Sequence, residues 1–236
     1  MTRRRWIADE VDGNRATLTG EHASHLSRVL RARVGQQFDI VTPEGLRLGR
    51  IASVTDDRVV FDLGEVISAP TALDLTVVLS IFKFDRMEWA IEKCTELGVA
   101  RIVPVIARRT ERHLAEAALK RVDRWRRIAA QASEQARRTA IPKIDDPIQL
   151  KDALAFPGDL RILLDEGDDT TMLRDLVHPG PSGAVLAFGP EGGWSSEEVA
   201  MFQEAGWKTA SLGSTILRAE TAVIAATAIA VSGMQE

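Results

Sequence analysis

The chain has 236 residues, of which 45% are hydrophobic and 27% are charged. This composition is ordinary for a soluble globular protein, so collagen-like and wholly disordered chains are excluded. The length suits one large domain, or a small and a medium domain. With a single cysteine, Cys94, the chain forms no internal disulfide and no cysteine-based metal cluster. No apolar run follows residues 1–5, and residues 221–231, the most apolar stretch, are too few and too rich in alanine to span a bilayer. We therefore expect a cytoplasmic protein with no membrane segment.

The net charge of −4 argues weakly against a nucleic-acid-binding protein, but the charge is unevenly distributed. Lysine and arginine outnumber aspartate and glutamate by 9 to 6 in residues 1–50 and by 12 to 6 in residues 101–150. The acidic residues dominate by 9 to 4 in residues 51–100 and by 10 to 3 in residues 151–200. If the fold gathers the two basic blocks on one face, that face can hold an anionic polymer. The alternative is that the basic residues lie on helix faces that are exposed to solvent.

Residues 1–70 predict a small β-rich domain with one helix. Pro43-Glu44-Gly45 is typical of a turn between two extended runs, and Asp56-Asp57 separates the next two. A small barrel is expected, with residues 68–71 as the linker that follows it. The expected strands are residues 16–18, 37–41, 46–54 and 58–66, and the expected helix is residues 21–30.

The hydrophobic pattern changes period over residues 71–236. Residues 75–82 form a continuous apolar run, which is typical of a strand buried on both faces. Asp85 and Ser195, each with a glutamate three positions later, are candidate helix N-caps, and Gly98 is placed to end a helix. Alternating strands and helices predict an α/β domain with a mainly parallel sheet. The strands are expected at 75–82, 101–106, 160–164, 184–188 and 209–212, and the helices at 85–97, 120–138, 195–206 and 219–232.

Two glycine-rich segments follow expected strands, where ligands bind in open α/β sheets. They are residues 189–193 and residues 212–218. Glycine lets the backbone approach a ligand closely, although both segments also suit strand-to-helix turns that need glycine for geometry. The chain lacks G-x-G-x-x-G after a strand and lacks G-x-x-x-x-G-K-[ST], which removes support for a Rossmann site and excludes a P-loop.

Among the charged residues, Arg218 and Glu220 stand out because they begin an otherwise apolar helix beside a glycine segment. They are solvated, paired with each other, or directed at a ligand. His22 and His25 lie one helical turn apart, which favours packing or capping over a metal pair. The acidic residues 165–169 lack the calcium-loop pattern and are interpreted as a turn and a helix start.

Four segments carry further motifs: DRMEW and KCTELGV within residues 85–99, QASEQ with RR and IP within 131–142, FGPEGGW at 188–194, and LGSTILRAETA at 212–222. Together, and in this order, they resemble the bacterial 16S ribosomal RNA (uracil-N3)-methyltransferases of the SPOUT class. Residues 4–6 and 25–31 are similar to that family's PUA-like RNA-binding domain. The stretch FKFD at residues 82–85 departs from the family, whose members more often carry Lys-Gly-Asp there.

The resemblance implies a PUA-like β-barrel over residues 1–70 and a SPOUT methyltransferase domain, with a parallel sheet and a deep trefoil knot, over residues 71–236. It also implies S-adenosylmethionine as the methyl donor, a homodimer, and no metal. The implied cofactor-binding residues are Leu164, Asp165, Gly189, Pro190, Glu191, Gly192, Gly193, Leu212, Gly213, Ile216 and Leu217.

The implied reaction is methylation at N3 of a uridine in 16S ribosomal RNA of the small ribosomal subunit. The N3 lone pair becomes available only when the imide proton leaves, so we expect Arg218 to stabilise the negative charge that develops. Glu220 is expected to orient Arg218 or to accept a proton. Trp6 and Trp194 are candidates for stacking on RNA bases, or are buried. The expected RNA-binding residues are Arg3, Arg4, Arg5, Arg28, Arg31, Arg33, Arg137 and Arg138.

Two alternatives stay open from the residues themselves. One is a SPOUT enzyme with another target, such as transfer RNA or 23S ribosomal RNA. The other is a ribosome-assembly factor that binds RNA and has lost catalysis. A small-molecule α/β enzyme would leave the β-rich first domain without an explanation.

Overall fold

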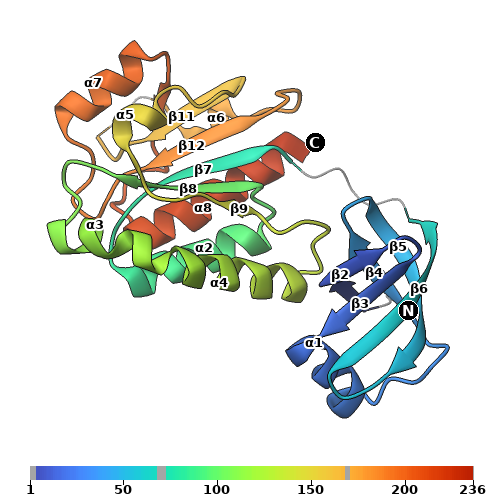
Figure 1. The fold of residues 1–236 in the computed structure, drawn as a ribbon. Coiled ribbons are helices and arrows are strands. Elements are labelled where there is room, and N and C mark those ends of the chain that lie inside the picture. Colours follow the sequence, from blue (N-terminus) through green and yellow to red (C-terminus); the bar gives the residue numbers. More distant parts are fainter. Residues whose placement is uncertain (1–3, 68–72, 168–170, 236) are drawn as a thin grey trace. The chain divides into compact units, whose positions relative to one another are not determined.

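The computed structural model describes residues 4–67, 73–167 and 171–235. The chain divides into two compact units: the first contains residues 1–71 and 134–140, and the second contains residues 72–133 and 141–236 (Figure 1). The sequence pattern placed residues 134–140 in the second domain, but their contacts are with the first unit. His22 Nε2 lies 2.9 Å from Glu134 Oε1, and the Arg5 guanidinium donates a hydrogen bond to the carbonyl of Arg137.

The first unit is a curled, half-barrel sheet of six strands in the order β1-β4-β5-β6-β3-β2. All neighbours are antiparallel except β1 and β4, and register shifts between β5 and β6 bend the sheet. Its core is apolar and includes Leu18, Ile40 and Phe61. The strands are β1 (Arg5–Ile7), β2 (Glu10–Asp12), β3 (Arg15–Thr19), β4 (Gln37–Thr42), β5 (Gly45–Val54) and β6 (Arg58–Val66).

The helix expected over residues 21–30 is shorter and less regular than its pattern indicates. It begins as α1 (Gly20–Ser24) and continues as a π-helical turn (His25–Val29). Arg31 then adopts a φ of 50°, in the left-handed region that ends a helix. The turn buries Leu26 and leaves Arg28 exposed, so the apolar face still reaches the core.

The second unit is built on a fully parallel sheet in the order β10-β8-β7-β12-β11-β13, with β9 paired to β8 (Figure 1). Every residue of β7 and β12 is buried, which confirms that the continuous apolar runs are strands covered on both faces. The strands are β7 (Leu75–Ser80), β8 (Arg101–Ile106), β9 (Lys143–Ile144), β10 (Ile148–Gln149), β11 (Leu160–Leu164), β12 (Ala184–Phe188) and β13 (Lys208–Ala210).

Helices cover both faces of this sheet and bury two separate apolar cores. The larger core contains Trp125 and Cys94, and the smaller core contains Phe202 and Trp207. The larger core packs under α2 (Phe84–Glu96), α3 (Arg112–Ala118), α4 (Val122–Gln135), α6 (Leu173–Leu176) and α8 (Ala219–Gln235), and the smaller core under α5 (Leu150–Ala153) and α7 (Ser196–Glu204).

Two helix boundaries correct the sequence interpretation. Asp85 is not an N-cap, because α2 already begins at Phe84 and its N-cap residue is Lys83. The helix expected over residues 120–138 starts as a 3₁₀ turn (Leu119–Arg121) and ends at Gln135, since Arg137 has a φ of 55°. By contrast, Ser195 is confirmed as an N-cap that forms a reciprocal capping box with Glu198.

The architecture is therefore the one that the resemblance implies, a parallel-sheet SPOUT-like domain that follows a small curled β-sheet domain. The trefoil knot concerns how the chain threads through itself, and it stays a prediction.

Candidate functional site

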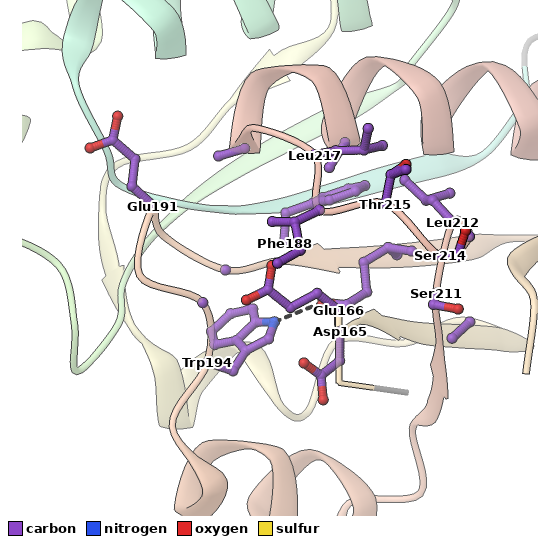
Figure 2. Close-up of a pocket in the computed structure, with 18 of the residues that line it drawn as sticks. Asp165, Glu166, Phe188, Glu191, Trp194, Ser211, Leu212, Ser214, Thr215 and Leu217 are labelled. Carbon is purple, nitrogen blue, oxygen red and sulfur yellow. Dashed lines mark hydrogen bonds between the residues drawn. The ribbon is translucent and has the colours of Figure 1, made fainter. Parts of the chain in front are cut away.

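A cavity of about 570 Å³ lies at the carboxyl ends of β11, β12 and β13 (Figure 2). Its volume falls within the range of roughly 300–1,000 Å³ that is typical of small-molecule sites. The two glycine-rich segments form much of its wall, as expected for loops that follow parallel strands. Ten of the eleven predicted cofactor-binding residues line it: Leu164, Asp165, Gly189, Pro190, Glu191, Gly193, Leu212, Gly213, Ile216 and Leu217.

The exception is Gly192, which does not line the cavity. Its carbonyl accepts a hydrogen bond of 2.6 Å from Nη1 of Arg109, and its Cα faces the aliphatic part of that side chain. Gly192 therefore connects the segment to the loop after β8.

The segment after β12 depends on close backbone packing. A Cβ at Gly189 would lie 3.2 Å from the carbonyl carbon of Gly193, which is tighter than side chains normally tolerate. Gly193 itself has a φ of 69° and donates a hydrogen bond of 2.8 Å to the Pro190 carbonyl. The segment is thus a tight turn that favours glycine at positions 189 and 193.

Trp194 follows this turn and is 6% exposed, so it is not a surface for stacking RNA bases. Its indole Nε1 donates a hydrogen bond of 3.1 Å to the carbonyl of Leu164, the last residue of β11 (Figure 2). Its ring packs edge-on against Phe202, with 5.1 Å between centroids. Trp194 therefore joins the ends of two strands at the floor of the cavity.

Sequence reasoning missed several other residues of the lining. Phe188 and Ala210 are the final residues of their strands, so the rule that ligands bind beyond strand ends could have found them. Met172 and Ser211 form an isolated β-bridge that no local sequence pattern predicts. The missed lining residues are Met172, Phe188, Trp194, Ala210, Ser211, Ala219 and Ala222, whereas Glu166, Ser214 and Thr215 lie within the expected segments but were not named singly.

Arg218 and Glu220 do not line the cavity, although their neighbours Leu217, Ala219 and Ala222 do. Arg218 is exposed, whereas Glu220 is 5% exposed. Of the three alternatives for this pair, the mutual ion pair is not the one that forms: Glu220 Oε1 lies 3.7 Å from Nε of Arg86, on α2. The other carboxylate oxygen, Oε2, is buried and has no hydrogen-bond partner within the described part of the chain.

The predicted RNA-binding arginines come together in one unit. Seven of the eight lie in the described residues, and all seven belong to the first unit, including Arg137 and Arg138. Arg3 lies outside the described residues. Arg28 pairs with Asp56 at 2.8 Å on the surface, and burial lowers the pKa of Arg138.

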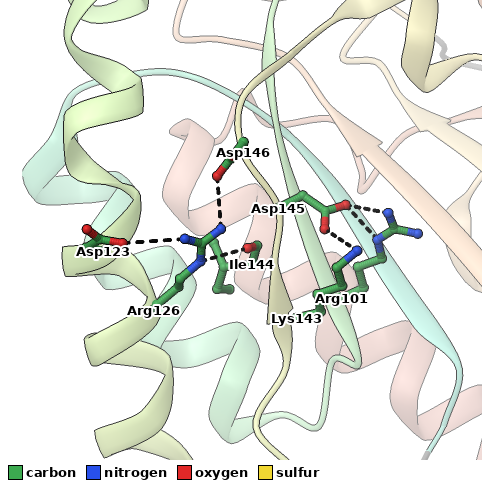
Figure 3. A network of polar contacts seen from close by, with 7 residues as sticks. All are labelled: Arg101, Asp123, Arg126, Lys143, Ile144, Asp145 and Asp146. Carbon is green, nitrogen blue, oxygen red and sulfur yellow. Dashed lines mark hydrogen bonds and ion pairs between the residues drawn. The ribbon is translucent and has the colours of Figure 1, made fainter.

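Other basic residues of positions 101–150 are balanced by carboxylates in the second unit (Figure 3). Arg101 Nε donates a hydrogen bond of 2.7 Å to Asp145, which also lies 2.9 Å from Lys143 Nζ. Arg126 donates a hydrogen bond of 2.9 Å to Asp146. The count of basic residues in this block therefore overstates the positive charge that it offers to an anion.

His22 is a structural cation. Its Nε2 lies 2.9 Å from Glu134 and its Nδ1 lies 3.3 Å from Asp9. The hydrogen bond to Glu134 raises the pKa of His22 to about 9, against the opposing effect of burial and with added attraction from both carboxylates. Both ring nitrogens of the protonated form donate to carboxylates, so His22 is not free to bind a metal. Trp6 packs between His22 and His25, with centroid distances of 6.0 and 5.8 Å.

Within the described residues, no group of three or more histidine, cysteine, aspartate or glutamate side chains is arranged to hold a metal ion. Asp168 and Asp169 of the acidic stretch lie outside the described residues, while Asp165 Oδ1 accepts a hydrogen bond from the Gly167 amide in a turn. No helix among the described residues is long and apolar enough to cross a membrane.

Comparison with known proteins identifies the family. A family model described as an RNA methyltransferase domain matches residues 69–231. The chain is 34% identical to the ribosomal RNA small subunit methyltransferase E of Synechocystis, and the match covers 87% of this chain and 69% of that protein. It is 30% identical to the Bacillus subtilis protein of the same name, and that match covers 87% of this chain and 85% of the relative. The crystal structure of a Neisseria gonorrhoeae ribosomal RNA small subunit methyltransferase E bound to S-adenosylmethionine is 30% identical, with a TM-score of 0.82 over 96% of this chain and 95% of that one. The chain therefore belongs to the RNA methyltransferase family that includes the ribosomal RNA small subunit methyltransferases E.

Proposed function

We propose that this chain transfers the methyl group of S-adenosylmethionine to N3 of a uridine in 16S ribosomal RNA. The observation that carries the proposal is the cavity at the ends of β11, β12 and β13, whose wall is made by the two segments that resemble the family's motifs. The relatives named above are methyltransferases of small-subunit ribosomal RNA, and one of them is bound to S-adenosylmethionine.

The residues around the cavity fit this cofactor. Leu164, Phe188 and Leu217 offer apolar surface for an adenine ring, and the glycine segments bring backbone amides and carbonyls close to it. Asp165 also lines the cavity, and its carboxylate attracts the positively charged sulfonium and ammonium groups. We assign cofactor binding to the ten predicted residues that line the cavity, and to Gly192 the anchoring of their segment to Arg109.

The bound cofactor supplies an activated methyl group, so the chain's task is to present a uracil whose N3 proton has left. Arg218 lies between two lining residues, Leu217 and Ala219, and its side chain is exposed. We assign to its guanidinium the stabilisation of negative charge on a uracil carbonyl oxygen. Glu220 pairs with Arg86 and not with Arg218, so we no longer assign it the orientation of Arg218.

RNA binding is assigned to the first unit. Arg4, Arg28, Arg31, Arg33 and Arg137 are exposed there and can contact phosphates. Such contacts release counterions and make affinity strongly dependent on salt. The target base must also be accessible or flipped out, because N3 is otherwise engaged in base pairing.

We further infer that the enzyme is a homodimer that acts on the small ribosomal subunit in the cytoplasm. Ile216 supports the dimer, since this large apolar side chain is 82% exposed on a segment that forms the cavity wall. An isoleucine so exposed beside a functional cavity is typical of a surface that another chain or a ligand covers.

The test is transfer of a labelled methyl group from S-adenosylmethionine to small ribosomal subunits that lack this modification, followed by mass spectrometry of the nucleosides. We expect N3-methyluridine. Matched reactions with free 16S ribosomal RNA, 23S ribosomal RNA and transfer RNA define the substrate. Cofactor binding without transfer to the small subunit or free 16S RNA contradicts the assigned target. Absence of both binding and transfer favours an RNA-binding assembly factor.

A further inference from the structure

Four charged side chains gather at one edge of the cavity, and we call them the rim cluster: Lys83, Arg86, Glu191 and Glu220. Arg86 Nη1 donates a hydrogen bond of 2.7 Å to Glu191 Oε1, and Arg86 Nε lies 3.7 Å from Glu220 Oε1. Lys83 Nζ lies 3.8 Å from Glu191 Oε2. Two cations and two carboxylates balance, so the rim cluster carries no net charge.

The two carboxylates belong to different walls of the cavity. Glu191 lies in the segment after β12, and Figure 2 shows its side chain pointing away from Phe188 and Trp194. Glu220 lies in the first turn of α8, whose residues Ala219 and Ala222 line the cavity. Arg86 contacts both, so a single guanidinium connects two walls that are 29 residues apart in the sequence (191 to 220).

The position of Arg86 on its helix indicates that this connection is not incidental. It is the third residue of α2, where the partial positive charge of the helix N-terminus disfavours a cation. The two carboxylates offset that repulsion. Glu220 needs a cation in return, because it is 5% exposed and a buried carboxylate is costly unless it is paired.

We propose that Arg86 is a positioning residue that sets the spacing of the two cavity walls by holding Glu191 and Glu220 at the same time. Its planar guanidinium suits this task, because Nη1 donates to Glu191 while Nε faces Glu220 in a second, fixed direction, whereas a lysine ammonium on a flexible stem presents a point charge. The proposal rests on the cavity being the cofactor site, as proposed above.

The test compares Arg86→Lys with Arg124→Lys. Arg124 is the matched control because its Nε donates a hydrogen bond of 2.7 Å to Glu88, which lies on α2 as Arg86 does. Neither Arg124 nor Glu88 lines the cavity. Arg86→Lys keeps the cation beside buried Glu220, so the protein should fold, and chemical denaturation checks this. We expect the Kd of S-adenosylmethionine, measured by calorimetry, to rise about tenfold in Arg86→Lys. It should change by less than about twofold in Arg124→Lys, since exposed ion pairs contribute little.

A second measurement separates positioning from simple structural support. Glu191→Gln and Glu220→Gln should affect cofactor affinity non-additively in the wild-type background, because Arg86 couples them. The same pair should become additive in the Arg86→Lys background. The inference is overturned if Arg86→Lys binds S-adenosylmethionine as tightly as wild type. It is also overturned if Glu191→Gln and Glu220→Gln remain non-additive in the Arg86→Lys background. If the wild-type protein itself does not bind S-adenosylmethionine, the proposed function fails instead.

Discussion

Replacement of Trp194 by phenylalanine tests whether the indole holds the cavity floor in place. The change keeps the aromatic contact with Phe202 and removes the hydrogen bond of 3.1 Å to the Leu164 carbonyl. A buried carbonyl that loses its partner costs about 1–3 kcal/mol, so we expect about 1.5 kcal/mol of lost stability. For a chain of this length that corresponds to a fall in Tm of roughly 3–6 °C.

Trp207→Phe is the matched control. The Trp207 indole also donates a hydrogen bond of 3.1 Å to a backbone carbonyl, that of Leu154, and also packs edge-on against Phe202. Trp207 does not line the cavity, however. We expect similar losses of stability by chemical denaturation, but a Kd for S-adenosylmethionine about tenfold higher, equivalent to about 1.4 kcal/mol, for Trp194→Phe alone. An equal loss of affinity in both variants would refute the reasoning, because it would trace the effect to overall stability.

Three further outcomes are expected. Arg218→Ala should lower the single-turnover rate of methyl transfer about 100-fold, with cofactor affinity unchanged by calorimetry; a full rate would remove Arg218 from the mechanism. Because the folded-state pKa of His22, about 9, lies above its ordinary value of 6.5, its contribution to stability should be complete below pH 6.5 and lost as the pH rises through 9. Denaturation of wild type and His22→Gln between pH 6 and 10 checks this, and an identical pH dependence in both would contradict it. Arg33→Ala should weaken RNA binding and reduce the slope of log affinity against log salt by about 1; an unchanged slope would show that Arg33 contacts no phosphate.

Much of the second unit could be predicted because its signals are local. Continuous apolar runs marked the central strands, since a parallel strand covered on both faces has no polar side. The capping box of Ser195 and Glu198 is likewise a short-range hydrogen-bond pattern. Asp85 matched the same pattern and was wrong, because α2 takes in Phe84, which packs against the larger core, and so starts earlier.

The site was predicted where function depends on backbone shape and missed where it depends on long-range pairing. Gly189 and Gly193 were identifiable because a tight turn needs glycine. The partner of Glu220 could not be found in the same way, since Arg86 lies 134 positions earlier (220 minus 86) and only the fold brings them together. Gly192, the one predicted cofactor-binding glycine that does not line the cavity, is likewise explained by a long-range contact, because it bonds to Arg109, which follows a different strand.

The division of the chain has a consequence for its synthesis. The first unit includes residues 134–140, which supply the carboxylate of Glu134 to His22 and the carbonyl of Arg137 to Arg5. At about 5–20 residues per second, a ribosome needs roughly 3.5–14 s to translate from residue 71 to residue 140. During that interval the nascent half-barrel exists without its last segment, while β7, α2 and β8 are already being made. The unit that is begun first is therefore completed only when more than half of the chain has been translated.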